Sequence, residues 1–461
     1  MINILIISFL LIVHSILLVN TLFTLWPEMT VYPYLLNNKY SLYKDIINPY
    51  PPALTILLAQ IGKVFGYLPF PYEVLTWATI LITDTLIFKI AKEITKKSLL
   101  AFLCTLFFVF LSVPFGVNGL WFDLIQTPLV LMSFYYFFDY LNTGGFKKLL
   151  LSFLYITVAF FIKQQAAWLA FWFLIYLFLT LKNKHDLNLK NIFLLATPFL
   201  ILSTLHLIYF SITGLFDEFY FWVIDFPIFQ SLNSAGYVQI PTLKQMAVVV
   251  SLFTLSIPVL KSKDLRLRTI PITALCLLLF AYPRFDYFHL IPSIAVLSLS
   301  IGISIRLFLK EQLLTKFFYL TVAVFLFTFS ARVYQLNWGQ NVRFFEPEIF
   351  TAAKHLSDNI HADNLVYIQN GPDQLLPLAK RLPPKPWVDE LPWYLEIGNV
   401  QQKVLNGIEK ENPAFIVYKP YSRGERYALG VYRPQKIADY LDNNYYNSVQ
   451  ISQDLWLKTK N

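Results

Sequence analysis

The 461-residue chain is 56% hydrophobic and 18% aromatic, and only 14% of its residues are charged. Soluble domains are nearer a quarter charged, so this composition excludes an ordinary water-soluble protein and indicates a polytopic membrane protein. The net charge of +9 lies in the apolar part, because 14 basic and 14 acidic residues balance from Leu336 onward. That distribution suits loops beside anionic lipid headgroups and excludes nucleic acid as a partner.

Apolar runs that suit membrane helices recur through the first two thirds of the chain. The first run has no basic n-region and no small-residue cleavage pattern, which favours a retained span over a removed signal peptide. The run 53–66 is short and contains Lys63, so we expect an interfacial helix there. The other runs predict eleven transmembrane helices, over residues 2–25, 73–94, 98–116, 121–141, 149–163, 165–181, 191–213, 242–260, 269–283, 290–308 and 317–335.

The basic residues decide the orientation of these spans. Basic clusters in short loops favour the cytoplasmic side, and all five clusters fall on one side only if 53–66 does not cross the membrane. The clusters are Lys96/Lys97, Lys147/Lys148, Lys182 to Lys190, Lys261 to Arg268 and Lys310 to Lys316. The N-terminus is then inside and the C-terminus outside. The extracytoplasmic loops are 26–72, 114–122, 214–241 and 284–289.

The character of the chain changes at about Trp338, where apolar runs shorten to strand length. Strand-like runs alternate with helical runs, which predicts a small α/β domain. The strands are expected at 364–369, 414–419 and 448–458, and the helices at 350–360, 373–382, 399–412 and 434–445. We therefore divide the chain into a transmembrane domain, 1–336, whose first outer loop is 26–72, and an extracytoplasmic α/β domain, 337–461.

Three carboxylates map to the outer side and are candidates for catalysis. Glu28 follows the first span, Asp45 precedes a proline corner, and Asp123 begins an apolar run. Each also has an ordinary interpretation: an interfacial carboxylate for Glu28, a turn residue for Asp45 and a helix N-cap for Asp123. Asp84 lies inside a span, where a lone carboxylate needs a partner, and we expect its role to be structural.

Cationic side chains gather on the same predicted side. Lys163 ends a span against the positive-inside trend, and Arg284 and His289 share an outer loop with Asp286 and Tyr287. The ordinary interpretations are a snorkelling lysine and a surface Arg–Asp pair. The functional alternative is a phosphate clamp, since arginine presents a planar fork of donors to phosphate oxygens.

Carboxylates and cations on one face suit the transfer of a group from a phosphate leaving group. A carboxylate accepts the proton of an acceptor hydroxyl, and cations stabilise the departing phosphate. The sequence contains no Gly-rich phosphate loop, no HExxH and no CxxC pair, so it indicates neither a nucleotide-driven pump nor a zinc site. We expect no cofactor; a divalent metal is compatible with the chemistry but is not indicated by the sequence.

Several short motifs carry a family resemblance. They are WPE at Trp26–Glu28, YKD at Tyr43–Asp45, a proline-led helix ending at Phe65–Gly66, Asp123 at the head of a span, Lys163 at a span end, and an R-x-x-Y-x-x-x-x-P pattern at Arg284, Tyr287 and Pro292. Over residues 1–335 this order resembles the GT-C superfamily of integral-membrane glycosyltransferases. The similarity is to its branch of protein mannosyltransferases and bacterial lipid A aminoarabinose transferases.

The resemblance implies a polyprenyl-phosphate-linked sugar as donor and a lipid, glycan or protein as acceptor, with inverting transfer on the extracytoplasmic face. It also implies that an acidic residue of the first outer loop is the base. The family motif often reads Asp-Glu and Pro27 takes the first place here, so Glu28 and Asp45 both stay candidates, with Asp123 third. The residues expected to bind phosphate or substrate are Lys163, Arg284, Tyr287 and His289.

Two other functions use the same features. A transporter or flippase of lipid-linked saccharides would need these cations and aromatics without bond formation. Transporters often contain repeated halves with broken helices, and we detect no such repeat. A non-catalytic assembly protein whose tail binds a partner is the third interpretation. For the enzyme, we expect the tail to recognise or position the acceptor and to carry no catalytic group.

The predicted orientation can be tested by cysteine labelling. Single cysteines at positions 147 and 263 should be protected from an impermeant reagent added outside, because both positions lie in basic loops. Positions within 338–461 should react. The native Cys104 and Cys276 would be replaced first, so that only the introduced thiols report. Labelling at 263 together with a protected tail would reverse the orientation.

Overall fold

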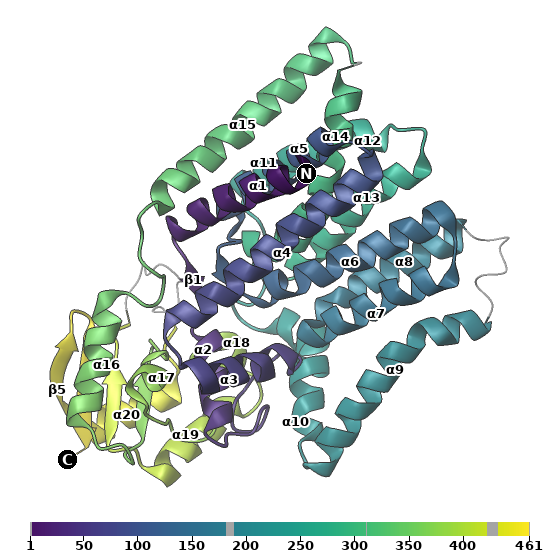
Figure 1. The fold of residues 1–461 in the computed structure, drawn as a ribbon. Coiled ribbons are helices and arrows are strands. Elements are labelled where there is room, and N and C mark those ends of the chain that lie inside the picture. Colours follow the sequence, from purple (N-terminus) through teal and green to yellow (C-terminus); the bar gives the residue numbers. More distant parts are fainter. Residues whose placement is uncertain (1, 181–188, 310, 422–431, 461) are drawn as a thin grey trace. The chain divides into compact units, whose positions relative to one another are not determined.

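A computed structural model describes residues 2–180, 189–309, 311–421 and 432–460 (Figure 1). Two compact units are present. The first comprises Met1–Phe23, Glu73–His206 and Ile240–Gln340, and the second comprises Thr24–Tyr72, Leu207–Gln239 and Asn341–Asn461. The second unit therefore contains the first outer loop and a middle segment as well as the tail. Part of the predicted basic loop at Lys182 to Lys190, and Lys310, lie outside the described residues.

Long apolar helices make up most of the first unit. Their backbone groups are satisfied within each helix, as a bilayer requires. The helices are α1 (Ile2–Val19), α4 (Pro69–Thr95), α5 (Ser98–Leu111), α6 (Phe122–Thr143), α7 (Phe146–Ile162), α8 (Ala167–Thr180), α9 (Leu189–Ile212), α11 (Leu243–Thr254), α12 (Ile257–Leu260), α13 (Leu265–Leu277), α14 (Ile291–Phe308) and α15 (Leu313–Asn337). Helices α4 and α9 each cross a unit boundary. Short elements between them are η1 (Val113–Phe115), β2 (Gly119–Leu120), η2 (Gln164–Ala166), η6 (Leu278–Ala281) and η7 (Tyr287–Leu290).

The described residues contain five helices that are long and apolar enough to cross a membrane, and several shorter apolar helices accompany them. The protein is therefore helical and multi-pass, while the count of eleven spans stays a prediction. The expected span 242–260 is not one helix, because α11 ends at Thr254 and α12 begins at Ile257. Pro258 explains the break: it has no backbone N–H with which to continue the helix.

Close backbone packing holds α14 against α5. An added Cβ at Gly302 would lie 2.8 Å from the carbonyl oxygen of Leu100, so only glycine fits there without a shift. The Gly302 N–H donates to Cys104 Sγ at 3.2 Å. Small residues at such crossings let membrane helices approach closely, and the buried Cys104 fills a packing position.

Asp84 of α4 finds its partner in α1. His14 Nδ1 lies 2.6 Å from Asp84 Oδ2, and both side chains are 0% exposed. The sequence required a partner for this carboxylate, and a histidine takes that place. The pair joins two apolar helices, which supports the structural role expected for Asp84.

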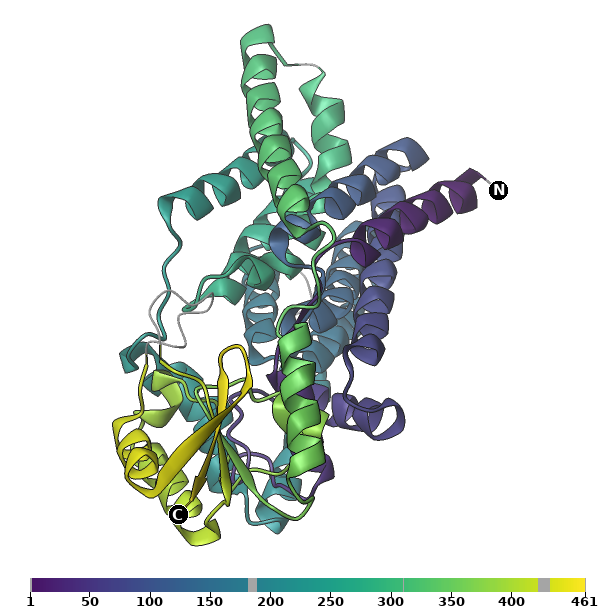
Figure 2. The ribbon, with the colours of Figure 1, turned by 90° about the vertical axis from the view of Figure 1, so that its left-hand side faces the viewer.

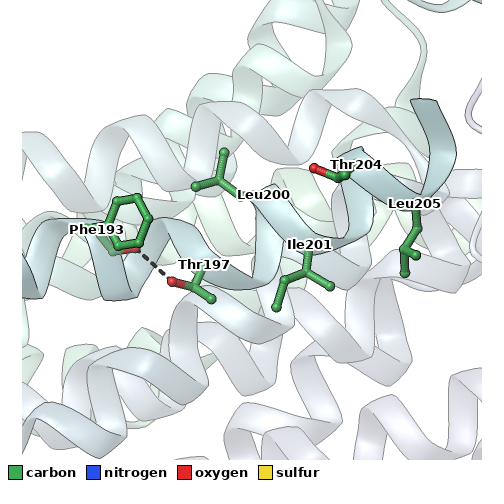
Figure 3. A pocket seen from close by; sticks show the side chains of 6 residues that line it. All are labelled: Phe193, Thr197, Leu200, Ile201, Thr204 and Leu205. Atoms are coloured by element: carbon green, nitrogen blue, oxygen red, sulfur yellow. Dashed lines mark hydrogen bonds between the residues drawn. The ribbon is translucent and has the colours of Figure 1, made fainter. Parts of the chain in front are cut away.

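Helix α9 has a largely apolar, exposed surface. Figure 3 shows a shallow hollow along it. The Thr197 hydroxyl donates to the Phe193 carbonyl oxygen at 3.0 Å, so its polar atom is satisfied within the helix. The hollow is lined by Phe193, Thr197, Leu200, Ile201, Thr204 and Leu205. This surface suits contact with lipid chains and holds no group for chemistry.

The second unit combines loop segments with the α/β tail. Its elements are β1 (Thr24–Leu25), α2 (Glu28–Asn37), α3 (Ala53–Phe65), α10 (Phe216–Tyr220), the π-helix η4 (Phe221–Gln230), η5 (Ser231–Asn233), α16 (Pro347–Asn359), β3 (Val366–Gln369), α17 (Leu375–Ala379), α18 (Pro392–Leu395), α19 (Val400–Glu411), β4 (Phe415–Tyr418), α20 (Gln435–Asn444), β5 (Tyr445–Ser452) and β6 (Leu455–Lys460). Helix α3 forms at 53–65, where an interfacial helix was expected.

The tail contains a four-stranded sheet in the order β3-β4-β6-β5. Strands β3 and β4 are parallel, and the other pairs are antiparallel. The single strand expected at 448–458 is wrong, because β5 and β6 form a hairpin that turns at Gln453 and Asp454. Aspartate is a common turn residue. Figure 2 shows this yellow hairpin with the green helix α16 beside it.

The tail holds the first outer loop through main-chain hydrogen bonds. The Trp387 N–H donates to the Asp45 carbonyl oxygen at 2.8 Å, and the Ile47 N–H donates to the Trp387 carbonyl oxygen at 3.2 Å. The Tyr40 hydroxyl donates to the Pro383 carbonyl oxygen at 2.5 Å. Residues 40–47 and 383–387 are therefore folded as one piece.

The His14–Asp84 pair gives a test of stability. Asp84→Leu leaves His14 without its partner in an apolar interior, and removing one member of a buried pair typically costs about 3–5 kcal/mol. The double variant Asp84→Leu/His14→Leu removes both polar groups, so we expect most of that loss to be recovered. Thermal unfolding in detergent measures both. A double variant as unstable as the single one would contradict the pairing.

Candidate active site

Three of the predicted site residues meet inside the first unit. Asp123 Oδ2 lies 2.6 Å from Lys163 Nζ and 2.8 Å from His289 Nδ1. Lys163 Nζ and His289 Nδ1 are 3.1 Å apart. The exposed fractions are 0% for Asp123, 2% for Lys163 and 6% for His289. The topology that placed these residues on one side of the membrane thus brought together groups that are in contact.

Each member of this cluster stands at the end of a helical element. Asp123 is in the first turn of α6, where the helix dipole favours a negative charge. Lys163 is the extended residue that ends α7. His289 belongs to η7, which leads into α14. The N-cap of α6 is Trp121, so the capping role considered for Asp123 does not apply.

The contacts of Asp123 make it the weakest candidate for the base. Its Oδ2 accepts hydrogen bonds from Lys163 and His289, and its Oδ1 accepts one from Gln126 Nε2 at 3.3 Å. A carboxylate whose two oxygens are both engaged and whose charge is matched by a lysine has little tendency to take a further proton. The arrangement suits a positioning role for Asp123.

The other two expected clamp residues lie in the loop before α14. Tyr287 packs edge-on against Phe115, with ring centroids 5.0 Å apart. The Tyr287 N–H donates to Asp286 Oδ1 at 2.6 Å, which caps η7. Arg284 is half-buried, two residues before that cap. It belongs to the same loop as His289 and stays a candidate for phosphate binding.

Asp45 is held as a turn residue in the second unit. Its Oδ2 accepts from the Ser41 N–H at 2.9 Å and lies 3.3 Å from Lys385 Nζ. Its own N–H donates to the Ser41 carbonyl oxygen at 2.9 Å. These contacts match the ordinary interpretation of this residue and show what its carboxylate does in the loop.

Glu28 is placed differently. It begins α2 directly after Pro27. Its Oε2 is buried and has no hydrogen-bond partner within the described parts of the chain. Burial raises the pKa of Glu28 to about 7, although a hydrogen bond with its own backbone opposes the shift. A general base works best when its pKa lies near the operating pH, so Glu28 has the properties of one.

Sequence reasoning missed three further carboxylates, which lie in the tail. Burial, together with the negative charges of Glu390 and Glu28, raises the pKa of Asp373 to about 8. Burial also raises the pKa of Asp389 well above its usual range, together with the charges of Glu28 and Asp373. These effects place Asp373 and Asp389 in the electrostatic neighbourhood of Glu28. The signal in the sequence was PWVDELPWY, where two carboxylates lie within an aromatic and proline-rich run.

Glu390 is fully engaged in hydrogen bonds. It accepts from the Tyr367 hydroxyl at 2.6 Å, from the Asn370 N–H at 2.9 Å and from the Tyr421 hydroxyl at 3.3 Å. Burial raises its pKa to about 7 against these bonds. Within the described ranges, no three His, Cys, Asp or Glu side chains are arranged to hold a metal ion.

Comparison with known proteins fits this architecture. The family model of dolichyl-phosphate-mannose-protein mannosyltransferases matches residues 49–209. No curated protein sequence matches the chain. The structure of ArnT from Cupriavidus metallidurans bound to undecaprenyl phosphate aligns over 99% of this chain and 97% of its own, with a TM-score of 0.64 and 10% identity.

A second solved structure points the same way. It is the oligosaccharyltransferase AglB from Archaeoglobus fulgidus in complex with an inhibitory peptide and a dolichol-phosphate. The alignment covers 96% of this chain and 73% of the AglB chain, with a TM-score of 0.51 and 10% identity. Both proteins are GT-C glycosyltransferases. The chain has a GT-C fold. The resemblance inferred from the motifs is thereby confirmed for the GT-C fold.

The buried cluster in this GT-C protein permits a test that separates stability from binding. Lys163→Met leaves Asp123 without its lysine, and we expect a loss of about 3–5 kcal/mol in stability, together with weaker donor binding if Lys163 also contacts phosphate. In the double variant Lys163→Met/Asp123→Asn the stability should largely return, because no uncompensated charge remains.

The two variants are compared by thermal unfolding and by affinity for undecaprenyl phosphate. Affinity for undecaprenyl phosphate that stays reduced in the stable double variant supports a phosphate-binding lysine. Affinity that returns with stability assigns Lys163 to structure alone. Wild-type stability in Lys163→Met would contradict the buried ion pair itself.

Proposed function

We propose that this protein is an inverting GT-C glycosyltransferase that transfers a sugar from a polyprenyl-phosphate-linked donor to an extracytoplasmic acceptor. The likeness to GT-C structures solved with undecaprenyl phosphate and dolichol-phosphate supports a lipid-phosphate donor. The match to a mannosyltransferase family model supports sugar transfer. The second unit, which contains the tail, would lie on the extracytoplasmic side.

The observation that carries the proposal is the state of Glu28. It combines a buried Oε2 that lacks a hydrogen-bond partner within the described residues with a pKa raised to about 7. Of the other two candidates, Asp45 has partners at Oδ2, and Asp123 has partners at both carboxylate oxygens. Glu28 is therefore the residue we assign as the base.

In the proposed reaction, Glu28 accepts the proton of the acceptor hydroxyl as that oxygen attacks the anomeric carbon. The bond between the anomeric carbon and the phosphate oxygen breaks, and polyprenyl phosphate leaves with the bonding electrons. Attack opposite to the leaving group inverts the anomeric configuration. A cation that binds the phosphate stabilises the charge that develops on it; Arg284 is the candidate with the fork geometry for this role.

The test is Glu28→Gln, which preserves shape and removes the proton acceptor. Removal of a general base lowers the rate by about 10²–10⁴-fold. Purified wild-type and variant proteins would be incubated with labelled undecaprenyl-phosphate-linked hexoses and pentoses and a membrane extract as acceptor source. Label transferred to the extract and undecaprenyl phosphate released are both measured.

Asp45→Asn is the matched control, since it also replaces one carboxylate of the first outer loop by an amide. We expect it to retain transfer within a few-fold of wild type, because Asp45 serves the turn. Near wild-type transfer by Glu28→Gln would show that Glu28 is not the base. Movement of intact labelled donor across a vesicle membrane, without cleavage, would favour the transporter alternative.

A further inference from the structure

The tail reaches the base through helix α2. Glu28 and Tyr32 are four residues apart on α2, so their side chains lie on one face of the helix, one turn apart. The Tyr32 hydroxyl donates to Asp389 Oδ2 at 3.1 Å, and both side chains are buried. Asp389 of the tail is thus tied to the face of α2 that carries Glu28.

The position of Asp389 is also fixed through its neighbour Trp387. Trp387, two residues earlier, packs edge-on against the Tyr32 ring, with centroids 5.5 Å apart. The backbone of Trp387 is bonded to Asp45 and Ile47 of the first outer loop. The segment that carries Asp389 is therefore anchored to the loop at two independent places.

Three carboxylates gather around this contact. Within the described residues, Glu28, Asp373 and Asp389 form no ion pair with a lysine or arginine. Burial raises the pKa of both Glu28 and Asp389, and their mutual repulsion adds to the shift of Asp389. Two carboxylates of this kind titrate as a pair and share one proton. The titratable groups that act on Asp389 are Glu28, Asp373 and Tyr32; both carboxylates in turn raise the pKa of Tyr394.

We propose that Asp389 is a positioning residue for sugar transfer: it holds the Glu28 face of α2 through Tyr32 and keeps the local charge beside the base at a single negative charge. This inference rests on Glu28 being the base. In the working state Glu28 is ionised and Asp389 carries the shared proton. Glu28 takes up the proton of the acceptor hydroxyl while polyprenyl phosphate departs, and water removes that proton after the product leaves.

The proposal predicts how the rate depends on pH. Below about pH 7 Glu28 becomes protonated and transfer falls. At high pH Asp389 loses its proton as well. The second negative charge repels the phosphate of the donor, so kcat/KM falls again, through a rise in the KM for donor. The wild-type profile is therefore bell-shaped. Its alkaline limb reflects two ionisations, that of Asp389 and that of Asp373, whose pKa is raised to about 8.

Asp389→Asn removes the second ionisation and still accepts the Tyr32 hydroxyl through its amide oxygen. We expect the alkaline limb to become shallower, because only the ionisation of Asp373 remains, while the acid limb stays near its wild-type position and the maximal rate stays within about ten-fold. Asp454→Asn is the control, because Asp454 is an exposed carboxylate of the same tail and undergoes the same chemical change. Its profile should superimpose on that of wild type.

Tyr32→Phe provides a second variant that leaves Asp389 in place. The Tyr32 hydrogen bond favours the ionised form of Asp389. Its loss raises the pKa of Asp389, so the alkaline limb should move to higher pH. A structural role alone would lower the rate at every pH without moving either limb.

The measurement is kcat/KM for a labelled undecaprenyl-phosphate sugar between pH 5 and 10, in full-length protein whose thermal unfolding matches that of wild type. A shallower alkaline limb in Asp389→Asn and an upward shift of that limb in Tyr32→Phe support the proposal. Unmoved limbs in both variants, or a folded Asp389→Asn inactive at every pH, overturn it. If wild type transfers no sugar, the proposed function fails instead, so the two failures are distinguishable.

Discussion

A buried charge must be neutralised by a counter-charge or by a proton, because its desolvation is otherwise too costly. The two units solve this in different ways. In the first, Asp123 is matched by Lys163 and His289, so its charge is fixed. In the second, Glu28 and Asp389 lack cations within the described residues, and protons balance their charges. Glu28, whose pKa is raised to about 7, can therefore gain and lose a proton near neutral pH, as a proton acceptor must.

Apolar periodicity and charge placement predicted most of the architecture. Lipid demands long apolar helices, so the runs at 2–25, 73–94 and 317–335 correspond closely to α1, α4 and α15. The positive-inside rule also placed Asp123, Lys163 and His289 on one side, and these three residues are in contact. Their contact is consistent with a shared side, and the side itself stays a prediction. Both constraints come from the bilayer and act on the chain locally.

Contacts between distant parts of the second unit could not be predicted in the same way. From the sequence, Asp389 resembles an ordinary carboxylate of a soluble domain. Only the structure shows its hydrogen bond with Tyr32, 357 residues earlier. The β5–β6 hairpin was missed because Gln453 and Asp454 interrupt the run without a glycine or proline to mark the turn. Asp84 required a partner, but the sequence alone did not identify His14.

The pairing of residue 387 with the first outer loop has a consequence for biosynthesis. Lys385 and Asp45 are 340 residues apart, so at about 5–20 residues per second a ribosome needs roughly 20 to 70 seconds to make the second after the first. During that time every intervening span enters the membrane. Under the proposed topology, the loop that carries Glu28 is among the earliest segments to be exported and among the last to complete its fold, which delays assembly of the proposed base until the whole chain has been made.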